Sequence, residues 1–74
     1  MKNQVKTYRD AGLEARWTKR NGTPFIAVRD PKAQSDHQRN TWWIVDRGMF
    51  DRMKKHGVRA GFDQSTVLGN FFSI

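Results

Sequence analysis

The sequence predicts an α+β fold in which a three-stranded antiparallel sheet carries one helix on one face. Three observations support this prediction. Residues 13–19 alternate between apolar and polar side chains, as a half-buried strand does. Asn21 and Gly22 form the strongest short signal for a β-hairpin, because both residues tolerate a positive φ. After Asp46 the apolar spacing changes from the period of a strand to that of a helix.

Three strands are expected between residues 13 and 46. The first strand should turn Leu13, Ala15 and Trp17 to one face. The second strand, residues 25–29, follows Pro24, which suits the start or the edge of a strand. The third strand, residues 41–46, is β-branched and aromatic. The second and third strands are apolar on both faces, so each face of the sheet is expected to need cover.

Residues 31–40 are polar and contain no large apolar side chain, which predicts a long, mobile hairpin loop. Lys32 and Arg39 make this loop basic, so it could touch a phosphate backbone. The alternative is a loop that is simply solvated.

The predicted helix follows Asp46, which can cap the first backbone N–H groups. Phe50 and Met53 are three residues apart and share one helix face. Gly57 can adopt the left-handed conformation that ends a helix. Residues 13–57 are therefore expected to form the folded core. Its buried aromatic residues are predicted to be Trp17, Trp43 and Phe50.

Residues 1–12 show no apolar period and are predicted to be a flexible basic arm outside the core. Such an arm could order on an acidic groove of a partner, with its cations supplying attraction and two apolar residues supplying a small contact. Its partner-binding residues would be Lys2, Val5, Lys6, Tyr8 and Arg9.

Residues 58–74 show no clear period but end in an apolar stretch. An apolar chain end is seldom left in water. We expect this segment either to pack on the core or to dock on a partner.

The 74-residue chain carries 14 basic and 7 acidic side chains, a formal charge of +7. Such an excess favours nucleic acid or an acidic protein surface as a partner, although the same charge also serves solubility. The chain has no cysteine, which excludes a disulfide framework and a thiolate metal site. No apolar run reaches the length of a membrane span. We expect a small cytoplasmic protein that is a monomer.

Candidate catalytic residues are few. His37 and His56 are the only histidines, and to hold zinc they would need carboxylates at a spacing that the chain does not offer. Ser35, Asp36 and His37 are adjacent in sequence, whereas a catalytic triad converges in space. We therefore predict no catalytic, cofactor or metal site, and a protein that is not an enzyme.

The order of three strands and a helix resembles the DNA-binding domains of the AP2 and integrase arm types. The residues that carry this resemblance are 20–22 at the first turn, 25–31 in the second strand, and Trp42 with Trp43 before the helix. The resemblance implies that basic residues of the sheet contact duplex DNA. Possible nucleic-acid contacts are Arg16, Arg29, Lys32 and Arg39. The chain departs from that family because its sheet offers few donors to base edges.

The small size, basic balance, aromatic content and lack of cysteine are also similar to small early proteins of tailed bacteriophages. Among these, the chain resembles the transcription regulators of Xanthomonas phages that bind host RNA polymerase. This resemblance implies a regulator without enzymatic activity in the host bacterial cytoplasm. It would inhibit initiation through loss of the σ factor, promote antitermination, or both. Duplex DNA binding of the AP2 or arm type is the alternative hypothesis.

Overall fold

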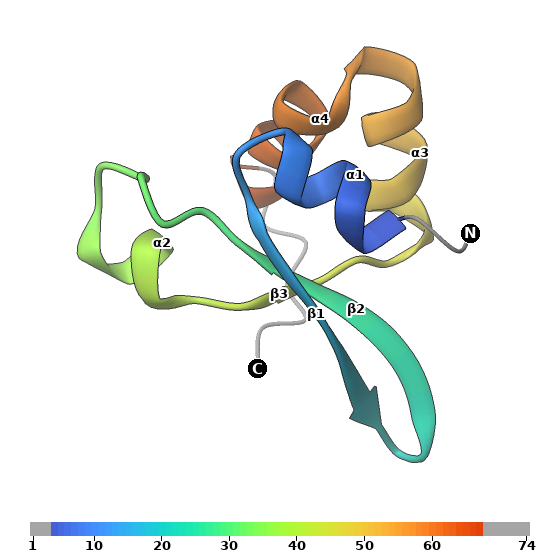
Figure 1. The fold of residues 1–74 in the computed structure, drawn as a ribbon. Coiled ribbons are helices and arrows are strands. Elements are labelled where there is room, and N and C mark those ends of the chain that lie inside the picture. Colours follow the sequence, from blue (N-terminus) through green and yellow to red (C-terminus); the bar gives the residue numbers. More distant parts are fainter. Residues whose placement is uncertain (1–3, 68–74) are drawn as a thin grey trace.

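The computed structural model describes residues 4–67 as four helices and a three-stranded antiparallel sheet (Figure 1). This arrangement confirms the predicted α+β class, but the prediction of a single helix was wrong. In chain order the elements are α1 (Gln4–Asp10), β1 (Glu14–Arg20), β2 (Thr23–Arg29), α2 (Asp36–Asn40), β3 (Trp43–Ile44), α3 (Arg47–His56) and α4 (Val58–Val67).

A long hairpin of β1 and β2 dominates the sheet. The two strands pair in antiparallel register from Glu14 opposite Arg29 to Arg20 opposite Thr23. The turn between them contains Asn21 at φ 52° and Gly22 at φ 80°. Two consecutive positive φ values are the signature of a type I′ turn, whose twist matches that of the strands. The predicted Asn-Gly hairpin is therefore confirmed.

The third strand is much shorter than predicted. β3 pairs with β2 only through Ile44 opposite Ala27 and Trp43 opposite Val28. One further hydrogen bond, from Val45 N to Ile26 O at 2.8 Å, extends the contact. The end of the hairpin near the turn projects past β3 and past the helices (Figure 1).

Every second residue of the strands points to one face of the sheet, and that face packs against the core. Figure 1 shows α1, α3 and α4 grouped together on one side of the sheet. The buried cluster comprises Leu13, Ala15, Ile26, Val28 and Trp43 from the sheet and its approach, with Tyr8, Met49, Met53 and Phe62 from the helices. Burial of Trp43 confirms its predicted place in the core.

The prediction for Trp17 was wrong, and that for Phe50 was only partly right. Trp17 shares the face of Ala15, yet 61% of its surface is exposed. Trp17 lies on the edge strand β1 and lines a hollow between α1 and α3, so the helices do not cover its ring. Phe50 is half-buried and is not a member of the buried cluster.

The N-terminal segment folds as α1, so the prediction of a flexible arm over residues 1–12 was wrong for the part that the structure describes. Tyr8 is only 2% exposed within the cluster, and Val5 packs against it. Arg9 Nη2 donates a hydrogen bond to Ala15 O at 2.9 Å. Val5 and Tyr8 are three residues apart and face the same way on a helix. The sheet supplies the apolar surface that stabilises so short a helix, and the local sequence gives no sign of that surface.

Helix α3 begins and ends where the sequence predicted. Asp46 Oδ1 accepts a hydrogen bond from Met49 N at 2.8 Å, and Gly57 closes the helix at φ 97°. Helix α4 then follows at once, in a region where no helix was predicted. Phe62 and Ser65 are buried, so α4 packs on the core, which was one of the two expectations for residues 58–74. Residues 68–74 lie outside the described range.

The predicted loop over residues 31–40 contains the short helix α2. Ser35 Oγ caps it by accepting a hydrogen bond from Gln38 N at 3.1 Å. Arg39 Nη1 donates to Ala33 O at 2.7 Å and to Gln34 O at 2.9 Å. These bonds give the segment a defined shape where the polar composition predicted a mobile loop.

We expect substitutions at Tyr8 to show that α1 belongs to the core. Tyr8→Ala should lower the free energy of unfolding by about 3–5 kcal/mol, because it leaves a cavity where an aromatic ring was buried. Tyr8→Phe should preserve or raise stability, because the hydroxyl is buried without a hydrogen-bond partner among the described residues. The measurement is denaturant unfolding followed by circular dichroism. As a control, Lys6→Ala removes only an exposed pair with Asp10 and should leave the midpoint nearly unchanged. A normal midpoint for Tyr8→Ala would contradict this place for α1.

A second stability prediction concerns the contact between α3 and α4. A Cβ added at Gly61 would lie 2.4 Å from Met53 N and 2.5 Å from the carbonyl carbon of Arg52. Gly61→Ala should therefore destabilise the protein, although alanine favours a helix by about 1 kcal/mol over glycine. Gly48→Ala is the matched control, because its Cβ would first meet the flexible Arg52 side chain at 3.4 Å. Thermal unfolding should show a lower midpoint for the first variant alone; equal midpoints would refute the close contact.

Candidate nucleic-acid interface

Two arginines and a tryptophan meet on the face of the sheet away from the buried cluster. Arg16 lies opposite Ala27, and Ala27 lies opposite Ile44, so these residues share the second face. Trp42 lies just before β3, and its ring contacts the arginines of that face. The Arg16 guanidinium carbon lies 4.1 Å from the centroid of the Trp42 ring, and that of Arg29 lies 5.2 Å from it. Both distances allow cation–π attraction.

The two arginines differ in how their charge is balanced. Arg29 Nε donates to Glu14 Oε1 at 2.7 Å, and its Nη2 pairs with the same carboxylate. The Arg29 side chain is only 27% exposed. Arg16 is exposed and makes its contact with the ring of Trp42. Of these two arginines, Arg16 therefore offers the more accessible positive charge to a partner.

The centre of the second face is closed and its margin is open. Ala27 and Ile44 are buried. Exposed and half-exposed polar residues form this margin along β1, at the turn and at the start of β2. These residues are Arg16, Thr18, Arg20, Asn21 and Thr23. A partner would thus meet a basic margin beside a half-buried aromatic ring.

The structure brings together two of the four predicted nucleic-acid contacts. Arg16 and Arg29 meet at Trp42. Arg39 holds the loop around α2 through backbone oxygens and an ion pair with Asp36. Lys32 is exposed in that loop. Trp42 itself was missing from the predicted contacts, although two adjacent tryptophans in a strand must face opposite ways.

The predicted partner-binding arm does not exist as a separate element in the described residues. Val5 and Tyr8 contribute to the core. Lys6 Nζ pairs with Asp10 Oδ2 at 2.8 Å, and this hydrogen bond and the negative charge of Asp10 raise the pKa of Lys6. Arg9 is bound to Ala15 O. Lys2 lies outside the described range.

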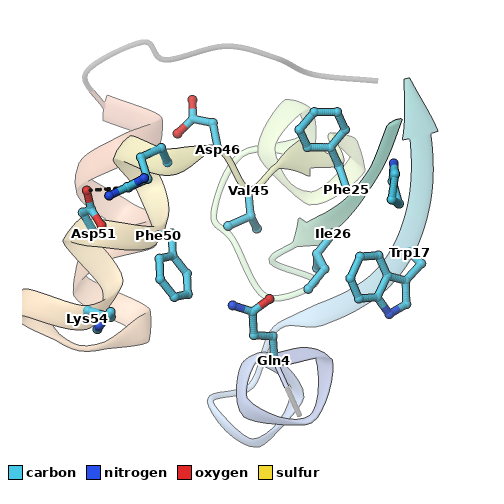
Figure 2. Close-up of a pocket in the computed structure, with 11 residues that line it drawn as sticks. Gln4, Trp17, Phe25, Ile26, Val45, Asp46, Phe50, Asp51 and Lys54 are labelled. Atoms are coloured by element: carbon cyan, nitrogen blue, oxygen red, sulfur yellow. Dashed lines mark ion pairs between the residues drawn. The ribbon is translucent and has the colours of Figure 1, made fainter. Parts of the chain in front are cut away.

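A hollow of about 500 Å³ lies between β2, α1 and α3, on the face of the hairpin that carries Trp17 and Ile26 (Figure 2). Figure 2 shows Trp17 and Ile26 on one side, Phe50 on the opposite side, and Val45 between them. Gln4 and charged residues of α3 also line the hollow. The hollow is mostly apolar, and the exposed ring of Trp17 stands at its margin.

The described residues contain no cluster of three or more histidine, aspartate or glutamate side chains that could hold a metal ion. Within residues 4–67, no helix has both the length and the apolar character needed to cross a bilayer.

Comparison of the chain with models of protein families, with curated proteins and with solved structures found no match. The surfaces described above are therefore the basis for assigning a function.

The exposure of Trp17 leads to a third prediction. Trp17→Ala should leave the free energy of unfolding nearly unchanged, because the ring contributes little to the core. Trp43→Ala, the matched substitution of a buried ring, should cost about 3–5 kcal/mol. Chemical denaturation of both variants under the same conditions provides the measurement. Similar losses for the two variants would mean that Trp17 packs in the folded protein.

Proposed function

We propose that this protein binds double-stranded DNA through the basic margin of the second sheet face. The observation that carries the proposal is the convergence of Arg16 and Arg29 on Trp42, on the face away from the buried cluster. The formal charge of +7 supplies long-range attraction to a polyanion. Arginine side chains can then make bidentate contacts with phosphate oxygens.

The binding should be weak and independent of sequence. Reading base edges in the major groove requires several Arg, Lys, Asn or Gln side chains directed from the reading element. In this face Arg29 is engaged by Glu14, and Ala27 and Ile44 occupy the centre. Phosphate contacts position a protein on a duplex without reading its sequence. Such contacts are what the exposed residues of this margin can make.

Binding of host RNA polymerase stays a prediction that rests on the resemblance to phage regulators. The flexible arm was the segment assigned to that partner, and the part of it that the structure describes is folded into the core. This finding favours the sheet face, and hence DNA, as the first site to test. A tagged pull-down from bacterial lysate, with and without nuclease, separates the two proposals. Polymerase retained after nuclease treatment would support the regulator, whereas loss of every partner would support DNA binding.

The fourth prediction concerns salt. Affinity for duplex DNA should fall steeply and equally for all sequences as salt rises, with a log–log slope of about −0.9 for each phosphate contact. Fluorescence anisotropy with several labelled duplexes at a series of salt concentrations measures this slope. One duplex bound roughly a thousandfold more tightly than random DNA would overturn sequence-independent binding and favour base-edge readout.

Charge-removing variants locate the interface in the same experiment. Arg16→Gln should weaken binding to every duplex and reduce the magnitude of the salt slope by about one contact. Lys55→Gln removes the same charge from an exposed position on α3 and should have a smaller effect. Equal losses for the two variants would show that net charge, and not the sheet face, determines binding.

A further inference from the structure

The outer edge of β1 presents backbone groups that no strand among residues 4–67 pairs with. β1 is an edge strand of the described sheet. In a hairpin with a two-residue turn, the residues that flank the turn form a hydrogen-bonded pair, here Arg20 and Thr23. Hydrogen-bonded pairs then recur at every second residue. The N–H and C=O groups of Ala15, Trp17 and Lys19 therefore point away from β2.

Only the end of this edge near α1 is covered in the described structure. Arg9 Nη2 donates to Ala15 O, which satisfies one outward carbonyl. Trp17 and Lys19 lie farther toward the turn. The end of the hairpin at the turn projects beyond the helices (Figure 1). A strand added there could pair with the N–H and C=O groups of both residues.

The opposite edge of the hairpin is protected. On β2, Ile26 O accepts a hydrogen bond from Val45 N at 2.8 Å. Pro24 occupies the next outward position and has no N–H to donate. Pro24 lies directly opposite Lys19. At this pair of positions the edge of β2 carries a proline, which has no N–H, whereas the edge of β1 carries an intact N–H. Only the edge of β1 can therefore accept a new strand.

Side chains near this edge define the chemistry of its occupant. Trp17, 61% exposed, offers an aromatic contact beside the apolar hollow of Figure 2. The strand carries the exposed cations Arg16 and Lys19, and its one carboxylate, Glu14, is held by Arg29. A second copy of the chain would carry the same net charge of +7, which opposes self-association. An acidic strand would instead be attracted.

We propose that the outer edge of β1 binds an extended acidic segment of a partner protein by strand addition, with an apolar side chain of that segment against Trp17. Backbone hydrogen bonds at Trp17 and Lys19 would supply affinity, and alternate side chains of the segment would supply specificity. This site differs from the proposed DNA interface, which uses the side chains of the second face. The two proposals can therefore fail independently.

The experiment uses the full chain and a terminally blocked nine-residue peptide that alternates glutamate with valine and has leucine at its centre. Lys19→Pro removes the outward N–H without removing a hydrogen bond between β1 and β2, because position 19 belongs to a non-hydrogen-bonded pair. Lys19→Gln is the matched control, since it removes the same charge and keeps the N–H. Binding is measured by titration calorimetry. Amide protection at Trp17 and Lys19 is followed by NMR.

We expect Lys19→Pro to bind the peptide at least about fivefold more weakly than Lys19→Gln, the loss that corresponds to one hydrogen bond. Peptide addition should slow amide exchange at Trp17 and Lys19 in the parent protein. Equal affinities for the two variants would overturn the proposal, as would unchanged exchange at both amides. Concentration-dependent dimers in sedimentation that place Trp17 at their interface would assign the edge to a second copy and would also overturn it.

A second peptide tests the proposal on the parent protein, so the test does not depend on the folding of Lys19→Pro. The same peptide with a central proline in place of leucine keeps its charge but cannot pair continuously as a strand. The proline peptide should bind the parent protein at least about fivefold more weakly than the leucine peptide does, which again corresponds to the loss of one hydrogen bond. Equal binding of the two peptides would show that charge alone attracts them. Duplex DNA affinity is measured on the same variants, and Lys19→Pro should bind DNA as Lys19→Gln does.

Discussion

The shortness of β3 is the constraint on which the rest of the structure depends. A sheet face is buried only where helices and neighbouring strands can cover it. β3 pairs with β2 at Ala27 and Val28, and the buried cluster gathers beside these positions. The part of the hairpin nearer the turn extends beyond this cover. The projection of residues 18–25 follows from that difference in strand length. The outer edge of β1 is unpaired for a separate reason, because β1 is an edge strand of the sheet.

Three helices must therefore stabilise a small core against a short stretch of sheet. Gly61 allows α3 and α4 to approach so closely that a Cβ would overlap the backbone of α3. Arg59 Nη2 pairs with Asp30 Oδ2 at 2.9 Å and ties α4 to the end of β2. Asp30 is buried, and its other oxygen, Oδ1, accepts a hydrogen bond from Lys32 N at 3.0 Å. Arg59 supplies the positive charge that a buried carboxylate needs. Arg9 makes a comparable connection between α1 and β1.

Sequence reasoning succeeded where a local rule determines the structure and failed where packing does. The turn at Asn21 and the cap at Asp46 depend on backbone conformations and hydrogen bonds within four residues, and both were predicted correctly. Helices α1 and α4 were missed. The first is too short to be stable alone, and the second contains Gly61, whose small size is needed by a neighbouring helix and is unfavourable within its own. For the candidate site, Arg16 and Arg29 were predicted, whereas their meeting at Trp42 depends on strand register.

The projecting hairpin separates three kinds of contact by direction. Because side chains alternate along a strand, Arg16 and Thr18 point to one face while Trp17 points to the other. The backbone groups of Trp17 lie in the plane of the sheet, perpendicular to both sets of side chains. A polyanion on the second face and a strand at the edge would therefore touch different atoms of neighbouring residues. Their common feature is the positive charge of β1, so salt should weaken encounters at both surfaces. Only the edge also depends on hydrogen bonds between backbones, which is why a proline at position 19 distinguishes the two surfaces.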